Sequence, residues 1–135
     1  MKVILVLLLA HADMPGMVPI AELAPEIYNV SREYNVDAEV LTRIILVESK
    51  GVPTAKNAKT GDYGLMQISP RTAKAYHISQ NCLKDWHCNL RRGAQILRDM
   101  QKSTIYRECA YNVGPAGTIR KPKACARYET LLADL

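Results

Sequence analysis

The segment VDAEVLTRIILVESKG, residues 36–51, carries the clearest structural signal in the chain. Asp37 is a residue type that favours the N-terminal cap of a helix, and Gly51 stands where a C-terminal cap is expected. Between them, apolar residues recur at spacings of three and four, which is the period of one helix face. The stripe consists of Leu41, Ile44 and Ile45. The stretch therefore predicts an amphipathic helix.

Glu48 occupies the next position on this apolar stripe, seven residues after Leu41. Loss of hydration disfavours the charged form of a carboxyl group and raises its pKa. A carboxylic acid that stays protonated near neutral pH can donate a proton to a leaving group. Glu48 is thus a candidate general acid. The alternative is that the stripe ends at Ile45 and that Glu48 is a solvated ion-pair partner at its rim.

The rest of the chain also reads as helices separated by polar turns. Residues 51–63 form a polar loop rich in turn formers. Ser69 precedes Pro70, a pair typical of a helix start, and Asp85 is expected to cap another helix. Long alternation of apolar and polar residues is missing, so the fold class is mainly α with little or no β-sheet. The expected helices are residues 20–34, the segment between the caps Asp37 and Gly51, a short segment after Ser69, 86–101, about 103–112 and 122–132.

The first twelve residues, MKVILVLLLAHA, have the features of an export signal. Lys2 precedes an apolar run that is too short to span a bilayer, and Ala10-His11-Ala12 has the small-x-small pattern of a cleavage site. We expect cleavage after Ala12, a periplasmic or secreted protein, and no stable membrane insertion afterwards. The alternative is a buried N-terminal strand or helix.

Four cysteines lie in the C-terminal half, at positions 82, 88, 109 and 125. They form no CxxC pair, so a zinc site is not expected and no metal is assigned. Among the three possible connectivities we favour Cys82–Cys88 and Cys109–Cys125, in agreement with export to an oxidising compartment. Four free thiols in a cytosolic protein are the alternative.

The chain has 135 residues, 48% of them hydrophobic, and a net charge of +5. This length suits one compact domain, and the composition excludes general disorder. The positive charge favours a polyanionic partner. Basic residues are scattered without interleaved aromatics, so nucleic acid is not the expected partner.

Three motifs occur in order along the chain. ES-x-G-x-P begins at Glu48, GLMQ covers residues 64–67, and AYN-x-GP covers residues 110–115. With these motifs the chain resembles the lytic transglycosylases of the soluble-transglycosylase type over residues 22–118. The resemblance implies a goose-type lysozyme-like fold, and we expect a single catalytic domain over residues 13–135 after the export signal of residues 1–12. Two segments depart from the usual pattern, Gly61-Asp62-Tyr63 before GLMQ and Asp85-Trp86 before Asn89.

The resemblance also implies roles for individual residues. Glu48 corresponds to the single catalytic acid and base, and Asn89 and Gly93 correspond to structural positions. A further set corresponds to residues that line the substrate cleft, with Tyr111 and Asn112 facing Glu48. The set that the resemblance assigns to substrate binding is Ser49, Gly64, Met66, Gln67, Tyr111 and Asn112.

The implied reaction cleaves the β-1,4 bond between N-acetylmuramic acid and N-acetylglucosamine and leaves 1,6-anhydromuramic acid ends. It needs no metal or organic cofactor. The expected partners are peptidoglycan strands and a secretion, pilus, conjugation or phage system for which the enzyme opens the wall locally. A lysozyme-type hydrolase is one alternative, because Asp62 could act as the second carboxylate that hydrolysis ordinarily needs. A non-catalytic glycan-binding assembly protein is the other.

Overall fold

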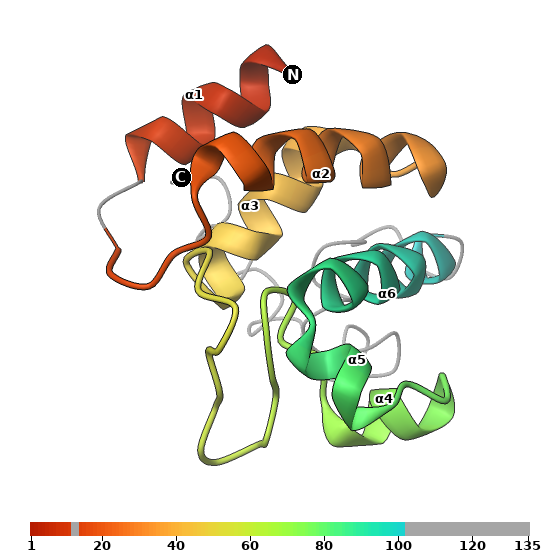
Figure 1. Ribbon diagram of the computed structural model, residues 1–135. Helices are drawn as coiled ribbons and strands as arrows, with labels where there is room; N and C mark the ends of the chain where they lie inside the picture. Colours follow the sequence, from red (N-terminus) through yellow and green to blue (C-terminus); the bar gives the residue numbers. More distant parts are fainter. Residues whose placement is uncertain (12–13, 102–135) are drawn as a thin grey trace, which may run out of the picture.

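The computed structural model describes residues 1–11 and 14–101, and this part of the chain is helical (Figure 1). Within these residues no strand forms. The β-structure of these residues consists of two isolated antiparallel bridges, one between Lys56 and Tyr63 and one between Tyr63 and Ile68. The expectation of a mainly α fold with little or no sheet is confirmed.

Six helices follow one another in the described residues, and most coincide with the predicted segments. The predicted helices over 103–112 and 122–132 lie outside the described residues. The elements are α1 (Lys2–Ala10), α2 (Ile20–Glu33), α3 (Ala38–Glu48), α4 (Pro70–Ala75), α5 (Gln80–Lys84) and α6 (Trp86–Met100).

The core lies where α2 meets α3 on one side and α6 on the other. In Figure 1, α1, α2 and α3 form one group of crossing helices, and α6 with α5 and α4 forms the other. Ile27 of α2, Ile45 of α3 and Leu97 of α6 are completely buried in this core. On the outside, Arg91 of α6 lies within ion-pair distance of two α2 carboxylates, 3.5 Å from Glu26 and 3.9 Å from Glu33.

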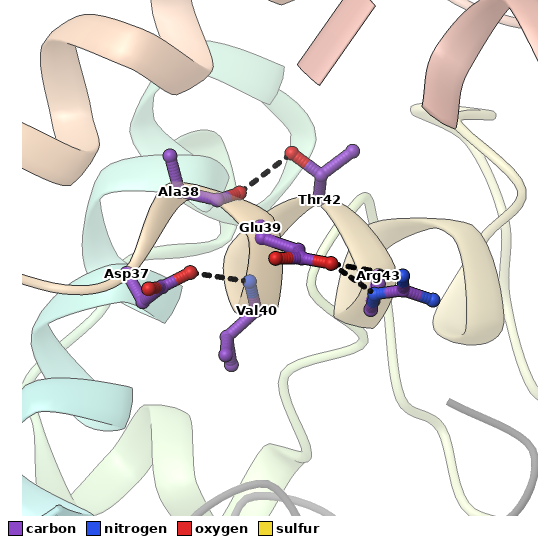
Figure 2. A network of polar contacts seen from close by, with 6 residues as sticks. All are labelled: Asp37, Ala38, Glu39, Val40, Thr42 and Arg43. Carbon is purple, nitrogen blue, oxygen red and sulfur yellow. Dashed lines mark hydrogen bonds and ion pairs between the residues drawn. The ribbon is translucent and has the colours of Figure 1, made fainter. Parts of the chain in front are cut away.

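The predicted helix caps are present. Figure 2 shows the start of α3, where the Asp37 carboxylate accepts a hydrogen bond from the Val40 amide at 3.0 Å. Ser69 caps α4 by accepting from the Thr72 amide, and Asp85 caps α6. Such side chains satisfy amide groups that have no partner inside the helix. The starts of these helices are therefore encoded locally.

The C-terminal end of α3 differs from the prediction. The helix ends at Glu48 and its C-cap is Ser49, two residues before the Gly51 cap that the sequence predicts, and Lys50 already adopts a left-handed conformation with a φ of 54°. Gly51 follows with a φ of 77°. A single glycine cap was expected, whereas two successive residues turn the chain. The short helix α5 was not predicted as a separate element, because its five residues are fewer than the periodicity signal requires.

The N-terminal segment is helical and packs on the domain. Ile4, Leu7 and Leu8 of α1 are buried, and α1 contacts both α2 and α3. On its outer face Val6 and Leu9 are exposed. The described part of the chain contains no helix long and apolar enough to cross a membrane. The alternative of an N-terminal helix with a buried face therefore agrees with α1. Cleavage after Ala12 stays a prediction.

A disulfide joins Cys82 of α5 to Cys88 of α6, as predicted. The second predicted pair, Cys109 and Cys125, lies outside the described residues. The bonded cysteines are six positions apart, so the bond closes a short loop around the Asp85 cap and constrains how α5 leads into α6.

We expect the double substitution Cys82→Ser/Cys88→Ser to lower the free energy of unfolding by about 2 kcal/mol, because an uncrosslinked loop gains entropy in the unfolded chain. Chemical denaturation of the two proteins measures the difference. Substitution is preferred to chemical reduction because a reducing agent would also act on Cys109 and Cys125. An unchanged denaturation midpoint would show that the loop is already ordered without the bond.

Candidate active site

The candidate site begins at Glu48, the last residue of α3. The preceding stripe residues are buried, as predicted, and Glu48 itself is partly buried. A carboxyl group in this position is held at the end of a rigid apolar helix and keeps partial access to solvent. That combination suits a group that must reach a substrate from a fixed position.

Ser49 fixes the backbone immediately after Glu48. Its hydroxyl donates to the Ile45 carbonyl oxygen at 3.1 Å and accepts from the Gly51 amide at 3.3 Å. The residue is buried. Ser49 therefore closes the end of α3, and a direct contact of its hydroxyl with substrate stays a prediction.

The GLMQ segment, residues 64–67, forms a tight turn. Tyr63 and Ile68 flank it and exchange both backbone hydrogen bonds, each at 3.1 Å. Gly64 has a φ of 86° and Gln67 a φ of 48°. Left-handed conformations are costly for residues with a side chain. The turn is thus held in a conformation that the surrounding contacts must stabilise.

The Gln67 side chain ties this turn to the loop that follows α3. Its amide nitrogen Nε2 donates to the carbonyl oxygens of Ala55 at 2.8 Å and Gly64 at 3.0 Å. The Ala55 oxygen also accepts from the Gly64 amide at 2.9 Å. Between Glu48 and Ala55 the chain makes two further turns, closed by Val52 and Ala55 amides. The end of α3 and the GLMQ turn are therefore joined by a continuous set of hydrogen bonds.

Asn89 of α6 supports the turn from the inside and is completely buried. Its side-chain oxygen accepts from the Met66 amide at 2.9 Å. Its side-chain nitrogen donates to the carbonyl oxygens of Tyr63 at 3.0 Å and Leu83 at 3.1 Å. A β-carbon at Gly64 would lie 2.2 Å from that nitrogen. Only glycine therefore fits at position 64, on grounds of both space and conformation.

Met66 is buried in the core rather than open at the surface. It lies against Gly93 of α6, where a β-carbon would come within 2.4 Å of the Met66 Cγ. Its burial favours a role in holding the turn, and contact with substrate stays a prediction. The structural roles expected for Asn89 and Gly93 are those observed.

A second contact holds the segment after the turn to α6. The Tyr76 hydroxyl donates to the Asp99 carboxylate at 2.7 Å, and Arg92 donates to the Tyr76 carbonyl oxygen. Burial, with a further contribution from the hydrogen bond to Asp99, raises the pKa of Tyr76 to about 12. The phenol therefore remains a donor at physiological pH. Nothing in the sequence pattern pointed to this pairing, because the two residues are 23 positions apart.

Tyr111 and Asn112, the residues expected to face Glu48, lie outside the described residues. Across residues 1–11 and 14–101, no group of His, Cys, Asp or Glu side chains is arranged to hold a metal ion. The described part of the site is thus Glu48, the end of α3, the connecting turns and the GLMQ turn on its Asn89 support.

Helices packed in two groups, with a carboxyl group at the end of an apolar helix, form a mainly α domain, as is expected of a lysozyme-like fold. The transglycosylase SLT domain matches residues 27–130, and the chain belongs to this family. The expected relationship to lytic transglycosylases of the soluble type is therefore confirmed.

A solved structure shows the same fold. It is that of an inactive mutant of the lytic transglycosylase Slt from Pseudomonas aeruginosa, with a TM-score of 0.61 and 24% sequence identity. The match covers 73% of the present chain and 17% of that protein, so the chain corresponds to a small part of its length. The comparison with curated proteins found no match.

Proposed function

We propose that the chain is a peptidoglycan lytic transglycosylase in which Glu48 is the catalytic acid and base. The observation that carries the proposal is the position of Glu48, partly buried at the end of α3 and joined by hydrogen-bonded turns to the GLMQ turn. Membership of the transglycosylase SLT family supports it. The substrate is the glycan strand of peptidoglycan.

The chemistry needs one carboxyl group used twice. Glu48 first donates its proton to the glycosidic oxygen between N-acetylmuramic acid and N-acetylglucosamine, and the bond to the anomeric carbon breaks. The substrate's own N-acetyl group stabilises the positive charge that develops there. Glu48, now ionised, takes the proton of the muramic acid 6-hydroxyl, whose oxygen bonds to the anomeric carbon. The nucleophile is already part of the reacting sugar, so its approach costs little entropy.

Around Glu48 the GLMQ turn forms one wall of the proposed cleft. Gly64 packs on Asn89 and gives the turn its shape, and contact of its backbone with a sugar is part of the proposal. The Gln67 side-chain oxygen accepts a hydrogen bond from a sugar hydroxyl or amide, because the side-chain nitrogen donates to Ala55 and Gly64. Ser49 and Met66 keep this wall in place. The family motif assigns Tyr111 and Asn112, which lie outside the described residues, to substrate binding at the same cleft.

Product analysis tests the proposal. Purified peptidoglycan digested with the protein should yield fragments with 1,6-anhydromuramic acid ends, which mass spectrometry separates from hydrolysed ends by the mass of one water. The Asp62→Asn variant should form the same product at a similar rate, because the reaction does not use a second carboxylate. Reducing ends whose formation is lost in Asp62→Asn would identify a lysozyme-type hydrolase. Binding to the wall without any cleavage would identify a glycan-binding protein.

We further propose that residues 1–12 direct export, which places the enzyme in the compartment where peptidoglycan lies. Local opening of the wall for a secretion, pilus, conjugation or phage system is the proposed use. Cleavage after Ala12 would remove α1 together with the buried side chains Ile4, Leu7 and Leu8. The N-terminal mass of the protein recovered from the cell envelope checks the cleavage, which predicts a chain beginning at residue 13.

A further inference from the structure

Positive charge is concentrated in the segment that surrounds the GLMQ turn. Residues 52–75 contain four basic residues and one acidic residue, a net charge of 4 − 1 = +3. Residues 20–39 contain one basic and five acidic residues, a net charge of 1 − 5 = −4. The basic surplus of the chain therefore does not cover its surface evenly. The four basic residues are Lys56, Lys59, Arg71 and Lys74.

The loop that carries Lys56 and Lys59 is held in a compact turn by hydrogen bonds between its own residues. The Asn57 side-chain oxygen accepts from the Lys59 amide at 2.9 Å and from the Thr60 amide at 3.2 Å. The Asn57 amide donates to the Asp62 carbonyl oxygen at 2.9 Å, and the Gly61 amide donates back to the Asn57 carbonyl oxygen at 2.7 Å. Lys59 thus projects from a compact turn with a defined backbone.

This turn lies between the GLMQ turn and the start of α4. At its base, Ala55 holds Gly64 and Gln67. At its tip, a β-carbon at Gly61 would lie 3.1 Å from the Cγ of Pro70, the first residue of α4. In Figure 1 the loop of residues 52–63 extends downward from the end of α3 and lies to the left of α4. We call the three basic residues on these neighbouring segments, Lys56, Lys59 and Arg71, the cationic rim.

The cationic rim is open to solvent, and no carboxylate of the described residues pairs with it. All three side chains are exposed. The ion pairs formed within the described residues involve Arg43, His87, Arg91 and Arg98, and none involves a rim residue. An exposed set of like charges beside a binding site attracts anions to it and raises their local concentration.

We propose that the cationic rim binds the carboxylate groups of the stem peptides that branch from the glycan strand. This inference rests on the proposed function, since it concerns the same site. The glycan backbone beside the scissile bond is uncharged apart from its lactyl-linked peptides, and the carboxylates of those peptides lie several bonds away from the sugar. Long, flexible lysine and arginine side chains on a loop at the edge of the site match such displaced anions. The preferred substrate is therefore a strand that carries charged stem peptides.

Contacts between exposed charges are individually weak and are screened by salt. Losing two rim charges should therefore raise the KM for cell wall roughly three- to tenfold at low ionic strength, with kcat little changed. At an ionic strength of about 0.5 M the difference should largely disappear, because the screening length then falls to a few ångströms.

The experiment uses the full chain and two forms of one wall preparation stripped of other wall polymers. In one form the stem carboxylates are intact. In the other they have been converted to amides with a carbodiimide and ammonia, which removes the charge and keeps the peptide. The rim variant Lys59→Gln/Arg71→Gln is compared with the control Arg32→Gln/Lys84→Gln. The control removes the same total charge at exposed positions away from the rim.

The wild type and the control variant should show a several-fold lower KM on the intact wall than on the amidated wall, and the rim variant should show the same high KM on both. Equal KM values of the wild type on the two walls would overturn the inference, as would a rim variant that keeps the preference. If neither wall yields anhydro ends, the proposed function itself has failed, which is a separate result. A preference lost equally in the control variant would assign the effect to net charge and not to the rim.

Discussion

The Glu48→Gln variant should cleave peptidoglycan on the order of 10²- to 10⁴-fold more slowly than the wild type. Glutamine keeps the size and shape of the side chain at the end of α3 but has no proton to donate and cannot take one back. Both proton transfers of the proposed reaction are lost together. Clearing of a cell-wall suspension, followed by turbidity, measures the rate, and the KM should change less than kcat.

Glu22→Gln is the matched control for this prediction. Glu22 lies in the first turn of α2 and is exposed, so the same chemical change there should leave the rate within about twofold of the wild type. Thermal unfolding of the Glu48 variant should remain cooperative and near that of the wild type, which separates lost chemistry from lost fold. A Glu48→Gln protein that clears walls at the wild-type rate would remove Glu48 from the mechanism.

The Asn89→Ala variant should lose about 3 kcal/mol or more of unfolding free energy. The substitution removes the hydrogen bonds that Asn89 makes to the Met66 amide and to the carbonyl oxygens of Tyr63 and Leu83. The Tyr63 oxygen keeps its bond from the Ile68 amide. Each buried polar group left unpaired costs about 1–3 kcal/mol. Water entering the vacated space offsets part of this sum. Urea denaturation measures the loss.

Asn81→Ala provides the comparison, because Asn81 lies in the adjacent helix α5 and is exposed. It should change stability by no more than about 0.5 kcal/mol. Activity of Asn89→Ala, measured where the protein is still folded, should also fall, because the GLMQ turn depends on these contacts for its shape. Equal stability of the two variants would mean that the turn is held by packing and not by Asn89.

The helix starts could be predicted from sequence because each cap is a contact between residues three or fewer positions apart. Asp37, Ser69 and Asp85 all cap the helices expected of them. The end of α3 was less predictable. Two successive left-handed residues, Lys50 and Gly51, turn the chain, and the Ser49 hydroxyl donates a hydrogen bond to a carbonyl of the last turn, whereas the sequence predicts a single glycine cap. The disulfide between Cys82 and Cys88 was expected from its short spacing, although spacing does not determine a connectivity.

Some features of the site residues could be predicted from local sequence, and others could not. Glu48 stood out because its position on an apolar stripe is visible in the local period. The burial of Met66 and the use of the Gln67 amide within the turn were not visible, because the motif alone does not show which side of the turn faces the protein. The supporting contacts of Asn89 join residues 23 and 26 positions away.

The helical class, the helix starts, the family motifs and the candidate acid can be read from the amino-acid sequence, because they depend on residue type and on contacts within a few positions. Three features could be found only in the folded chain: Asn89 and Gly93 of α6 support the GLMQ turn, the loop at Gly61 lies against the start of α4, and Tyr76 pairs with Asp99. Such contacts depend on how distant segments pack, and packing is set by the shapes of many side chains at once.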